Sequence, residues 1–410
     1  MTTTLPTIDA IRDKFPALNG DTILLENAGG SQVPRCVADG IRDHCLNNYV
    51  QLGAGYPMSN RATATVDAAH AFVETLVNGA DTGRVILGSS CTSLTYMLSD
   101  AIGRTIKPGD EIVLCVQGHE ANVGPWLRLA ERGAVIRWWD VDPETGSLDL
   151  DALSTLLNDR TRIVAFPHVS NLLGEIVDAR AVADLAHAHG ARVVVDGVAY
   201  APHRTIDVEA LAADWYVYST YKVYGPHMGA LWGRDDAISE LDGPNHFFIP
   251  RDEVPYVFEL GGASHEGCAG ILSLGEYLAF LTGSTGPCTT TIAHQAFDLM
   301  RDLETPVQAH LLERLTRHPE VRIIGTPSAD PDERVATISF LHARQQPDTI
   351  VRAAHAANVG IRNGHMYAWR LCERMGIPVE SGVVRVSAVH YNTIAEVDHL
   401  MDALDPILSA

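Results

Sequence analysis

The chain has 410 residues, enough for two or three domains and a sizeable buried core. Apolar residues make up 46% of it and charged residues 20%, which is typical of a globular protein. Its formal net charge of −21 argues against nucleic acid or an anionic membrane surface as the main partner.

Neither membrane insertion nor secretion is indicated. No apolar run approaches the roughly 18 residues that a membrane helix needs. The first residues, MTTTLPTIDAIRDKF, lack a basic start followed by an apolar core. The seven cysteines are scattered and form no CxxC pair, so neither a disulfide framework nor a zinc ribbon is predicted. We expect a cytoplasmic protein.

Short Val- and Ile-rich runs alternate with helical patterns through the first part of the chain. The predicted strands cover 84–88, 111–116, 134–140, 162–170, 191–197, 214–219 and 229–234. The predicted helices lie near 92–104, 123–132 and 178–189. Continuous apolar strands between helices indicate a mostly parallel sheet covered on both faces, which is an α/β architecture.

The pattern changes after about residue 285. Strands are predicted at 322–325, 335–341 and 383–389, with helices near 290–317, 347–357 and 394–408. A stretch rich in Gly, Ser and Thr at 282–290 favours a domain boundary there. We therefore expect a large domain over 18–285 and a small α+β domain over 286–410, with residues 1–17 packing against the small one.

Two stretches carry residues that could bind a ligand or react with one, VVVDGVAYAPH (193–203) and YVYSTYKVYGPHMGALWG (216–233). Asp196 follows an apolar strand, and ligands of open α/β sheets bind beyond the carboxyl ends of strands. Lys222 follows another strand, and a partly desolvated lysine there can attack carbonyl groups. The chain contains no P-loop, dinucleotide fingerprint, nucleophile elbow or HExxH motif, and no metal site is expected.

With these motifs the chain resembles the class V aminotransferases of PLP fold type I, in the branch of the cysteine desulfurase-like proteins. The resemblance runs from LENAGGSQVP (25–34) to VRVSAVHYNT (384–393). It implies a large, mostly parallel, seven-stranded sheet domain, a smaller C-terminal domain, and pyridoxal 5'-phosphate (PLP) as cofactor. Lys222 would hold the PLP aldehyde covalently and then move the substrate Cα proton. The Asp196 carboxylate would keep the pyridine nitrogen protonated.

The resemblance also assigns partners to the PLP phosphate. In GSSCTS (88–93), Ser89, Ser90 and Cys91 lie where backbone N–H groups at a helix N-terminus would face an anion. Ser219 matches another phosphate-binding position. Tyr221 stands where desulfurases usually carry a histidine, and its hydroxyl could serve the same phosphate.

Further positions of the family concern the PLP ring and the substrate. His119 matches the histidine that stacks on the ring and can pass protons to substrate. Asn171 matches an asparagine that hydrogen-bonds the phenolic oxygen. Arg385 matches the arginine that binds the substrate carboxylate with its planar fork, and Arg362 is a second candidate for that role.

The sequence departs from true cysteine desulfurases in the loop that carries their nucleophile. Tyr367, within IRNGHMYAWRL (361–371), falls at or near the position of that cysteine, and tyrosine cannot form a persulfide. Cys372 is expected to pack in the core from within a helix. Sulfur donation to iron–sulfur assembly is therefore not expected.

Two further departures lie elsewhere in the site. Ala199 replaces a polar residue and leaves more space beside the ring. Gly262 falls at the position of the threonine that a partner subunit donates to the phosphate, and either Ser264 or His265 could substitute for it. The family builds its site across a dimer interface, so the resemblance implies a homodimer with shared active sites.

Three functions remain open at this point. A β-eliminating C–S lyase acting on cysteine or an S-substituted cysteine needs no active-site cysteine. Transamination, epimerisation or oxidative deamination would use the same lysine, aspartate and arginine, because the reaction is selected by which bond stands perpendicular to the ring. A scaffold that binds PLP without turnover is the third.

Overall fold

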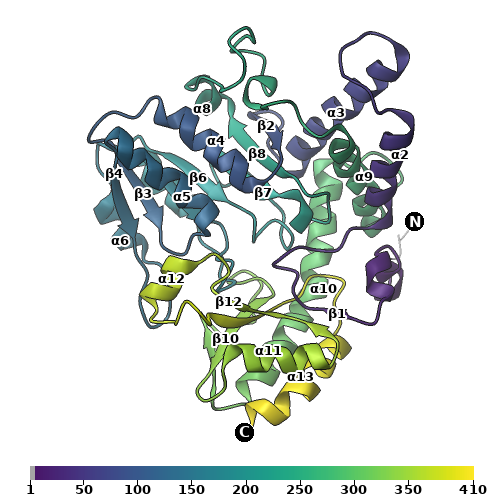
Figure 1. Cartoon of the computed structure of the whole chain (residues 1–410), viewed down its shortest axis with the longest axis vertical. Helices are drawn as coiled ribbons and strands as arrows, with labels where there is room; N and C mark the ends of the chain where they lie inside the picture. Colours follow the sequence, from purple (N-terminus) through teal and green to yellow (C-terminus); the bar gives the residue numbers. More distant parts are fainter. Residues whose placement is uncertain (1–4) are drawn as a thin grey trace.

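The structure, a computed structural model, describes residues 5–410, and its main element is a seven-stranded sheet (Figure 1). The strands are β2 (Gly83–Gly88), β3 (Glu111–Cys115), β4 (Val135–Trp139), β5 (Thr161–Pro167), β6 (Arg192–Asp196), β7 (Trp215–Ser219) and β8 (Gly229–Arg234). Their order is β2-β8-β7-β6-β5-β3-β4; β8 is antiparallel to both β2 and β7, and the other pairs are parallel. The predicted α/β class and mostly parallel sheet are confirmed.

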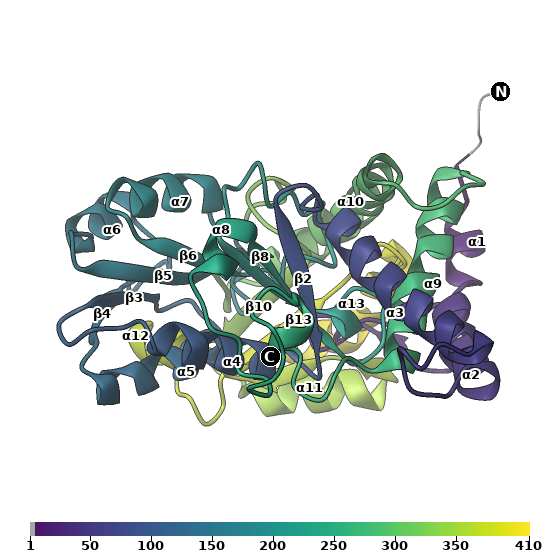
Figure 2. The same ribbon diagram turned by 90° about the horizontal axis from the view of Figure 1, so that it is seen from above.

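Helices cover both faces of this sheet, as Figure 2 shows from above. On one face lie α4 (Cys91–Gly103) and α5 (Gly124–Leu127), and on the other α6 (Leu150–Leu156) and α7 (Ala179–Ala188). The short α8 (Asp235–Ser239) follows β8. The central strands β3, β5, β6 and β7 are almost wholly buried, which explains why they read as continuous apolar runs.

Three long helices beside β2 lie outside the predicted elements. They are α2 (Arg35–Asn47), α3 (Pro57–Leu76) and α9 (His265–Thr282), and α9 packs against both of the others. The short α1 (Ile8–Arg12) precedes them, and the Phe15 side chain that follows it is fully buried.

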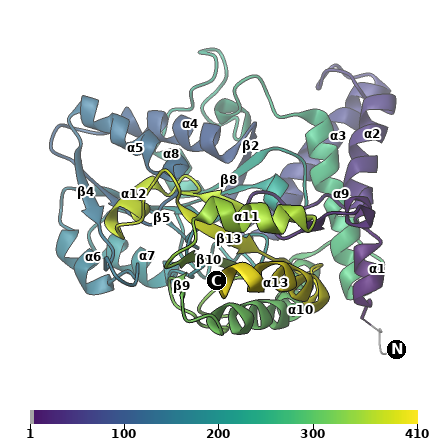
Figure 3. The same cartoon turned by 60° about the horizontal axis from the view of Figure 1, so that its bottom comes forward.

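A second sheet of four strands, in the order β12-β13-β10-β9, lies in the C-terminal part (Figure 3). The strands are β9 (Val321–Ile324), β10 (Thr337–His342), β12 (Arg362–Gly364) and β13 (Val383–Ser387). The helices are α10 (Thr290–Thr316), α11 (Pro347–Ala356), α12 (Trp369–Arg374) and α13 (Ile394–Leu408). A two-stranded parallel pair, β1 (Ile23–Leu24) with β11 (Val359–Gly360), ties the N-terminal segment to this part of the chain.

The connection between α9 and α10 occupies residues 283–289, within the stretch proposed as the domain boundary. The division into 18–285 and 286–410 stays a proposal. Within the described part of the N-terminal segment, Arg12 donates a hydrogen bond to the Tyr391 carbonyl at 2.7 Å. The Phe15 ring meets Tyr391 but also Tyr224 and Tyr277, so it contacts both parts of the chain.

Some predicted elements end elsewhere. The helix expected near 123–132 is found in two parts: α5 ends at Leu127, and a 3₁₀ helix continues over Arg128–Arg132. The strand expected over 162–170 ends at Pro167, and the His168 N–H makes the last bond to β6, to the Asp196 carbonyl at 2.8 Å. None of the helices within residues 5–410 is long and apolar enough to cross a membrane. In the same range no cluster of three or more His, Cys, Asp or Glu side chains could hold a metal ion.

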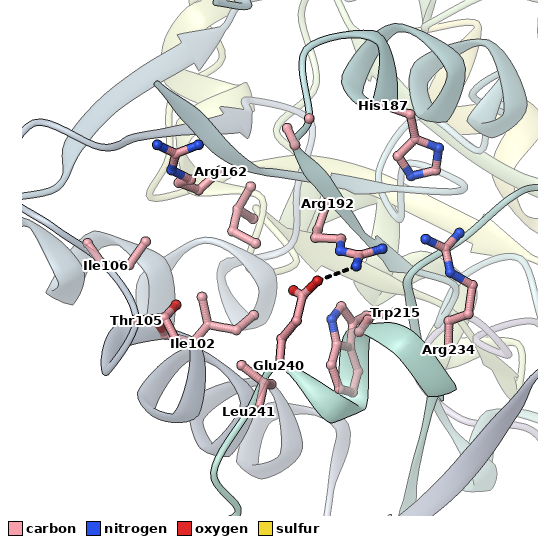
Figure 4. Close-up of a pocket in the computed structure, with 14 residues that line it drawn as sticks. Ile102, Thr105, Ile106, Arg162, His187, Arg192, Trp215, Arg234, Glu240 and Leu241 are labelled. Atoms are coloured by element: carbon pink, nitrogen blue, oxygen red, sulfur yellow. Dashed lines mark hydrogen bonds and ion pairs between the residues drawn. The ribbon is translucent and has the colours of Figure 1, made fainter. Parts of the chain in front are cut away.

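The amino ends of the central strands carry a dense network of charges (Figure 4). A surface hollow there is lined by Arg162, Arg192, Arg234 and Glu240 among others. The fully buried Asp214 carboxylate accepts bonds from Arg192 at 2.8 Å, Arg234 at 2.7 Å and His187 at 2.8 Å. Each arginine is thus neutralised by carboxylates, which leaves no free cation for an anionic ligand.

We expect Asp214→Ala to destabilise the fold by about 3 kcal/mol, because it leaves two arginines without their shared buried partner. Ion pairs hold the pKa of Asp214 below its ordinary value. Its contribution is therefore complete above pH roughly 4 and is lost as pH falls through the lower pKa of the folded state. Urea unfolding of both proteins at several pH values measures this, and the difference should shrink in acid. Asp236→Asn is the control, since Asp236 pairs with the same arginines but is exposed, and its loss should cost less than about 1 kcal/mol.

Candidate active site

A cavity opens at the carboxyl ends of β5, β6 and β7. Its lining comprises Cys91, Thr92, His119, Ala121, Pro167, Val169, Asn171, Asp196, Val198, Ala199, Ser219, Tyr221 and Lys222. Seven residues predicted from sequence therefore meet here: Cys91, His119, Asn171, Asp196, Ser219, Tyr221 and Lys222.

Lys222 lies at the end of a 3₁₀ turn, Thr220–Lys222, that follows β7. Ser31 spans this turn: its hydroxyl donates to the Tyr221 carbonyl at 3.2 Å and accepts from the Tyr224 N–H at 2.9 Å. Burial, together with the nearby Arg385, lowers the pKa of Lys222 to about 8, although Asp196 acts in the opposite direction. About a tenth of this amine is therefore uncharged at pH 7, far more than for a lysine with the ordinary pKa.

Asp196 is the last residue of β6 and is 4% exposed. One carboxylate oxygen accepts a hydrogen bond from the Val198 N–H at 3.0 Å. Burial raises the pKa of Asp196 to about 6, while that hydrogen bond and Lys222 lower it. A buried carboxylate without a full set of partners favours a cationic N–H group beside it.

His119 and Asn171 come from the loops after β3 and β5. Burial and the positive charges of Lys222 and Arg385 lower the pKa of His119 to about 4, so its imidazole is neutral. The Asn171 amide donates to the Met366 carbonyl at 2.7 Å. Within the described residues the buried Asn171 Oδ1 has no hydrogen-bond partner and can accept a bond from a bound group.

The start of α4 borders the cavity beside Lys222. Ser90 caps this helix: its hydroxyl accepts from the Ser93 N–H at 3.1 Å, and the Ser93 hydroxyl accepts from the Ser90 N–H at 3.1 Å. Ser89 and Ser90 lie outside the cavity lining, whereas Cys91 belongs to it. A Cβ at Gly229 would lie 2.5 Å from the Cys91 nitrogen, so only glycine lets β8 approach this loop. The free N–H groups and positive end of α4 favour an anion here.

Arg385 lies on β13 and is 3% exposed. Its Nη1 donates to the Asn171 carbonyl at 3.0 Å, which brings it beside the cavity although it is not among the lining residues. Its Nε is buried without a partner among the residues described. Arg362 stands opposite Arg385 on β12, but it is exposed and pairs with Glu26 at 3.4 Å.

Tyr367 is 61% exposed and lies at the mouth, not in the lining. Its ring centroid is 5.0 Å from that of His119. Its carbonyl accepts from the Glu120 N–H at 2.9 Å. Cys372 is fully buried within α12, and burial raises the pKa of its thiol to about 11, as expected for core packing.

Gly262 lies away from the cavity, in a second hollow that also includes Ser89, Ser93 and Ser264. Its φ of +82° falls in the left-handed region that favours glycine. Ser264 caps α9 by accepting from the Gly267 N–H at 3.1 Å. Within one chain, these residues therefore face the other side of the Ser89 loop.

Four apolar lining residues were not singled out by the sequence analysis, and Ala121 and Val198 are two of them. Both follow a predicted site residue by two positions, His119 and Asp196 respectively. Small apolar side chains carry no chemical signal of their own, so only their spacing from these residues could have indicated them.

Comparisons with known proteins agree with this geometry. The family model "Aminotransferase class-V" matches residues 23–400. The aminotransferase-like protein FGM3 of Gibberella zeae is 39% identical over 98% of both chains. The cysteine desulfurase-like protein ustD of Aspergillus flavus is 31% identical, covering 98% of this chain and 91% of that one. The apo structure of a cysteine desulfurase from Thermococcus onnurineus NA1 superposes with a TM-score of 0.86, at 22% identity and 99% coverage of both chains.

Fold and family together define a PLP-dependent enzyme of fold type I. The chain belongs to the class V aminotransferase family and is a cysteine desulfurase-like member of it.

The cavity fits PLP. An amine for the aldehyde, a helix N-terminus for the phosphate, a buried carboxylate for the ring nitrogen and an unpaired amide oxygen all border one space. Lys222, α4, Asp196 and Asn171 supply these groups in that order.

Proposed function

We propose that this enzyme is a C–S lyase that eliminates the β-sulfur of cysteine or of an S-substituted cysteine. The observation that carries this proposal is the side chain at the mouth of the cavity, the exposed phenol of Tyr367 beside His119. The thiol in the cavity lining, Cys91, is buried, and burial raises its pKa well above the ordinary value. A thiolate to accept sulfur is thus not favoured, whereas elimination needs none.

When bound, PLP supplies the electron sink for the carbanion at the substrate Cα. Arg385 binds the substrate carboxylate and orients the amino acid at the mouth. The uncharged Lys222 amine accepts the Cα proton, and the electron pair of that bond expels the β-sulfur as a thiolate. Asp196 would hold a proton at the ring nitrogen. The sulfur leaves as a thiolate beside neutral His119 and takes its proton from water. With water consumed, the products are a thiol, pyruvate and ammonia.

Transamination is the second candidate, favoured by the 39% identity to a protein named aminotransferase-like. The same residues would serve it: Arg385 would bind the carboxylate, Asp196 would pair with the ring nitrogen, and Lys222 would move the Cα proton without a bond being broken at Cβ. Epimerisation and oxidative deamination would also begin with loss of the Cα proton.

We also propose a homodimer with shared sites, working in the cytoplasm. Gly262 and Ser264 face the outer side of the Ser89 loop, where a second copy would reach the phosphate. Seven free cysteines fit a reducing compartment.

Product analysis tests the proposed reaction. The purified enzyme with PLP is mixed with cysteine and a series of S-substituted cysteines, without any keto acid, and pyruvate, alanine and free thiol are measured. Pyruvate and thiol in equal amounts are expected. Alanine with sulfur left on the protein would contradict elimination and indicate desulfuration, and neither product would favour transamination with another amino donor.

A further inference from the structure

A chain of hydrogen bonds behind the cavity joins segments that are distant in sequence. The Tyr277 hydroxyl lies 2.6 Å from His390 Nε2, and His390 Nδ1 lies 3.1 Å from the Tyr224 hydroxyl. The Tyr224 hydroxyl lies 2.7 Å from the Pro202 carbonyl. Tyr224, Tyr277 and His390 are buried, and the Phe15 ring packs against all three.

The donor and the acceptor of each of these hydrogen bonds can be assigned by starting from the Pro202 carbonyl. The Pro202 carbonyl can only accept, so the single Tyr224 hydroxyl proton must point to it. The Tyr224 oxygen therefore accepts from His390, which places the imidazole proton on Nδ1. Burial lowers the pKa of His390 to about 3, so the ring is neutral and Nε2 carries a lone pair. That lone pair accepts a hydrogen bond from the Tyr277 hydroxyl. The donors and acceptors of the hydrogen-bonded chain therefore have a single arrangement.

Two of these hydrogen bonds meet at the hydroxyl of Tyr224, which follows the turn that carries Lys222. Tyr224 stands two residues after Lys222 with a φ of +58°, a left-handed conformation that is unfavourable for a residue other than glycine. Such a conformation persists only where the surroundings hold it. The Ser31 hydroxyl holds the Tyr224 backbone N–H, and the hydrogen-bonded chain holds the Tyr224 hydroxyl.

Pro202 and His390, two other members of the hydrogen-bonded chain, come shortly after Asp196 and Arg385 in the sequence. Pro202 lies in the loop that leaves Asp196 at the end of β6, and His390 lies just beyond β13, which carries Arg385. One side chain, Tyr224, thus links the segments that bear the lysine, the aspartate and the arginine.

We propose that Tyr224 is a positioning residue, and that the chain Tyr277–His390–Tyr224–Pro202 holds the Lys222 amine in its desolvated place beside Asp196 and Arg385. The inference rests on Lys222 being the lysine that holds PLP, but not on which reaction follows. The charged and titratable groups that act on the Lys222 amine include Arg385, Asp196, Cys91, Glu26 and His119.

The test measures the pH dependence of PLP attachment to the apoenzyme. Only the uncharged amine attacks the aldehyde, so the rate of appearance of the visible PLP band rises through the pKa of Lys222. Tyr224→Phe keeps the ring but leaves the Pro202 carbonyl and the His390 N–H unpaired. We expect the midpoint to rise by about one pH unit, toward the ordinary lysine value, as Lys222 becomes better solvated.

Tyr277→Phe supplies a second variant far from Lys222 in sequence. It frees His390 Nε2 to take the proton, which breaks the bond to Tyr224, so a smaller shift in the same direction is expected. The double variant should shift no further than Tyr224→Phe alone, because both act through one chain. Tyr218→Phe, at a buried tyrosine of β7 outside the chain, should leave the midpoint unchanged.

A midpoint for Tyr224→Phe within about 0.2 unit of wild type would overturn the proposal, even if its melting temperature falls, since the role would then be structural only. Should Tyr224→Phe fail to fold, an unchanged midpoint for Tyr277→Phe has the same meaning. Borohydride reduction and peptide mapping identify the modified lysine. A label away from Lys222 would overturn the site assignment instead of the positioning role.

Discussion

Lys222→Ala is expected to abolish covalent attachment of PLP and to lower turnover by at least about 10⁴-fold, since the same amine holds the cofactor and moves the Cα proton. Absorbance of the reconstituted protein and the rate of pyruvate formation measure the two effects. Turnover at the wild-type rate would remove Lys222 from the site.

The small number of lysines limits the alternative sites for PLP attachment in this experiment. The chain has three lysines, Lys14, Lys107 and Lys222, and the first two are exposed. Lys107→Ala is the matched control and should retain both the PLP band and activity. Lys222→Arg keeps a positive charge but supplies no nucleophile, because the guanidinium stays protonated. It should therefore be as inactive as the alanine variant.

Arg385→Ala should lower kcat/KM by roughly 10–100-fold, mainly through a higher KM, because a charge-assisted bidentate contact to the substrate carboxylate is lost. Steady-state kinetics with the best substrate from the product analysis measures this. Removing the charge also eliminates one cause of the low pKa of Lys222. The pH profile of PLP attachment should consequently move to higher pH.

Arg362→Ala is the control for that variant. Arg362 is exposed and paired with Glu26, and its loss should change KM by less than about twofold, as for other exposed pairs. An unchanged KM for Arg385→Ala would take Arg385 out of the substrate site. An increase for Arg362→Ala alone would transfer the role to Arg362.

The sequence predicts the large sheet well because its signals are local. Buried strands such as β5 and β6 read as runs of apolar residues, and Asp196 directly follows one of them. Parallel strands bring their carboxyl ends to one edge, so His119, Asn171, Asp196 and Lys222 could be expected to meet from their places after strands. The cavity brings them together, while their individual roles stay proposals.

Other features depend on tertiary contacts that no local pattern carries. The choice between Arg385 and Arg362 rests on Glu26, which is far away in sequence and accepts from Arg362. The tautomer of His390 is determined by the Pro202 carbonyl through Tyr224.

The loop that carries Tyr367 is held across the mouth by two hydrogen bonds, from Asn171 to Met366 and from Glu120 to Tyr367. Met366 and Tyr367 both have left-handed backbones, with φ of +50° and +61°. The donors of both bonds belong to the loops after β5 and β3, so the backbone next to the Tyr367 phenol is fixed by the large sheet as well as by its own loop. A change in either of those loops would therefore move the phenol at the mouth of the site.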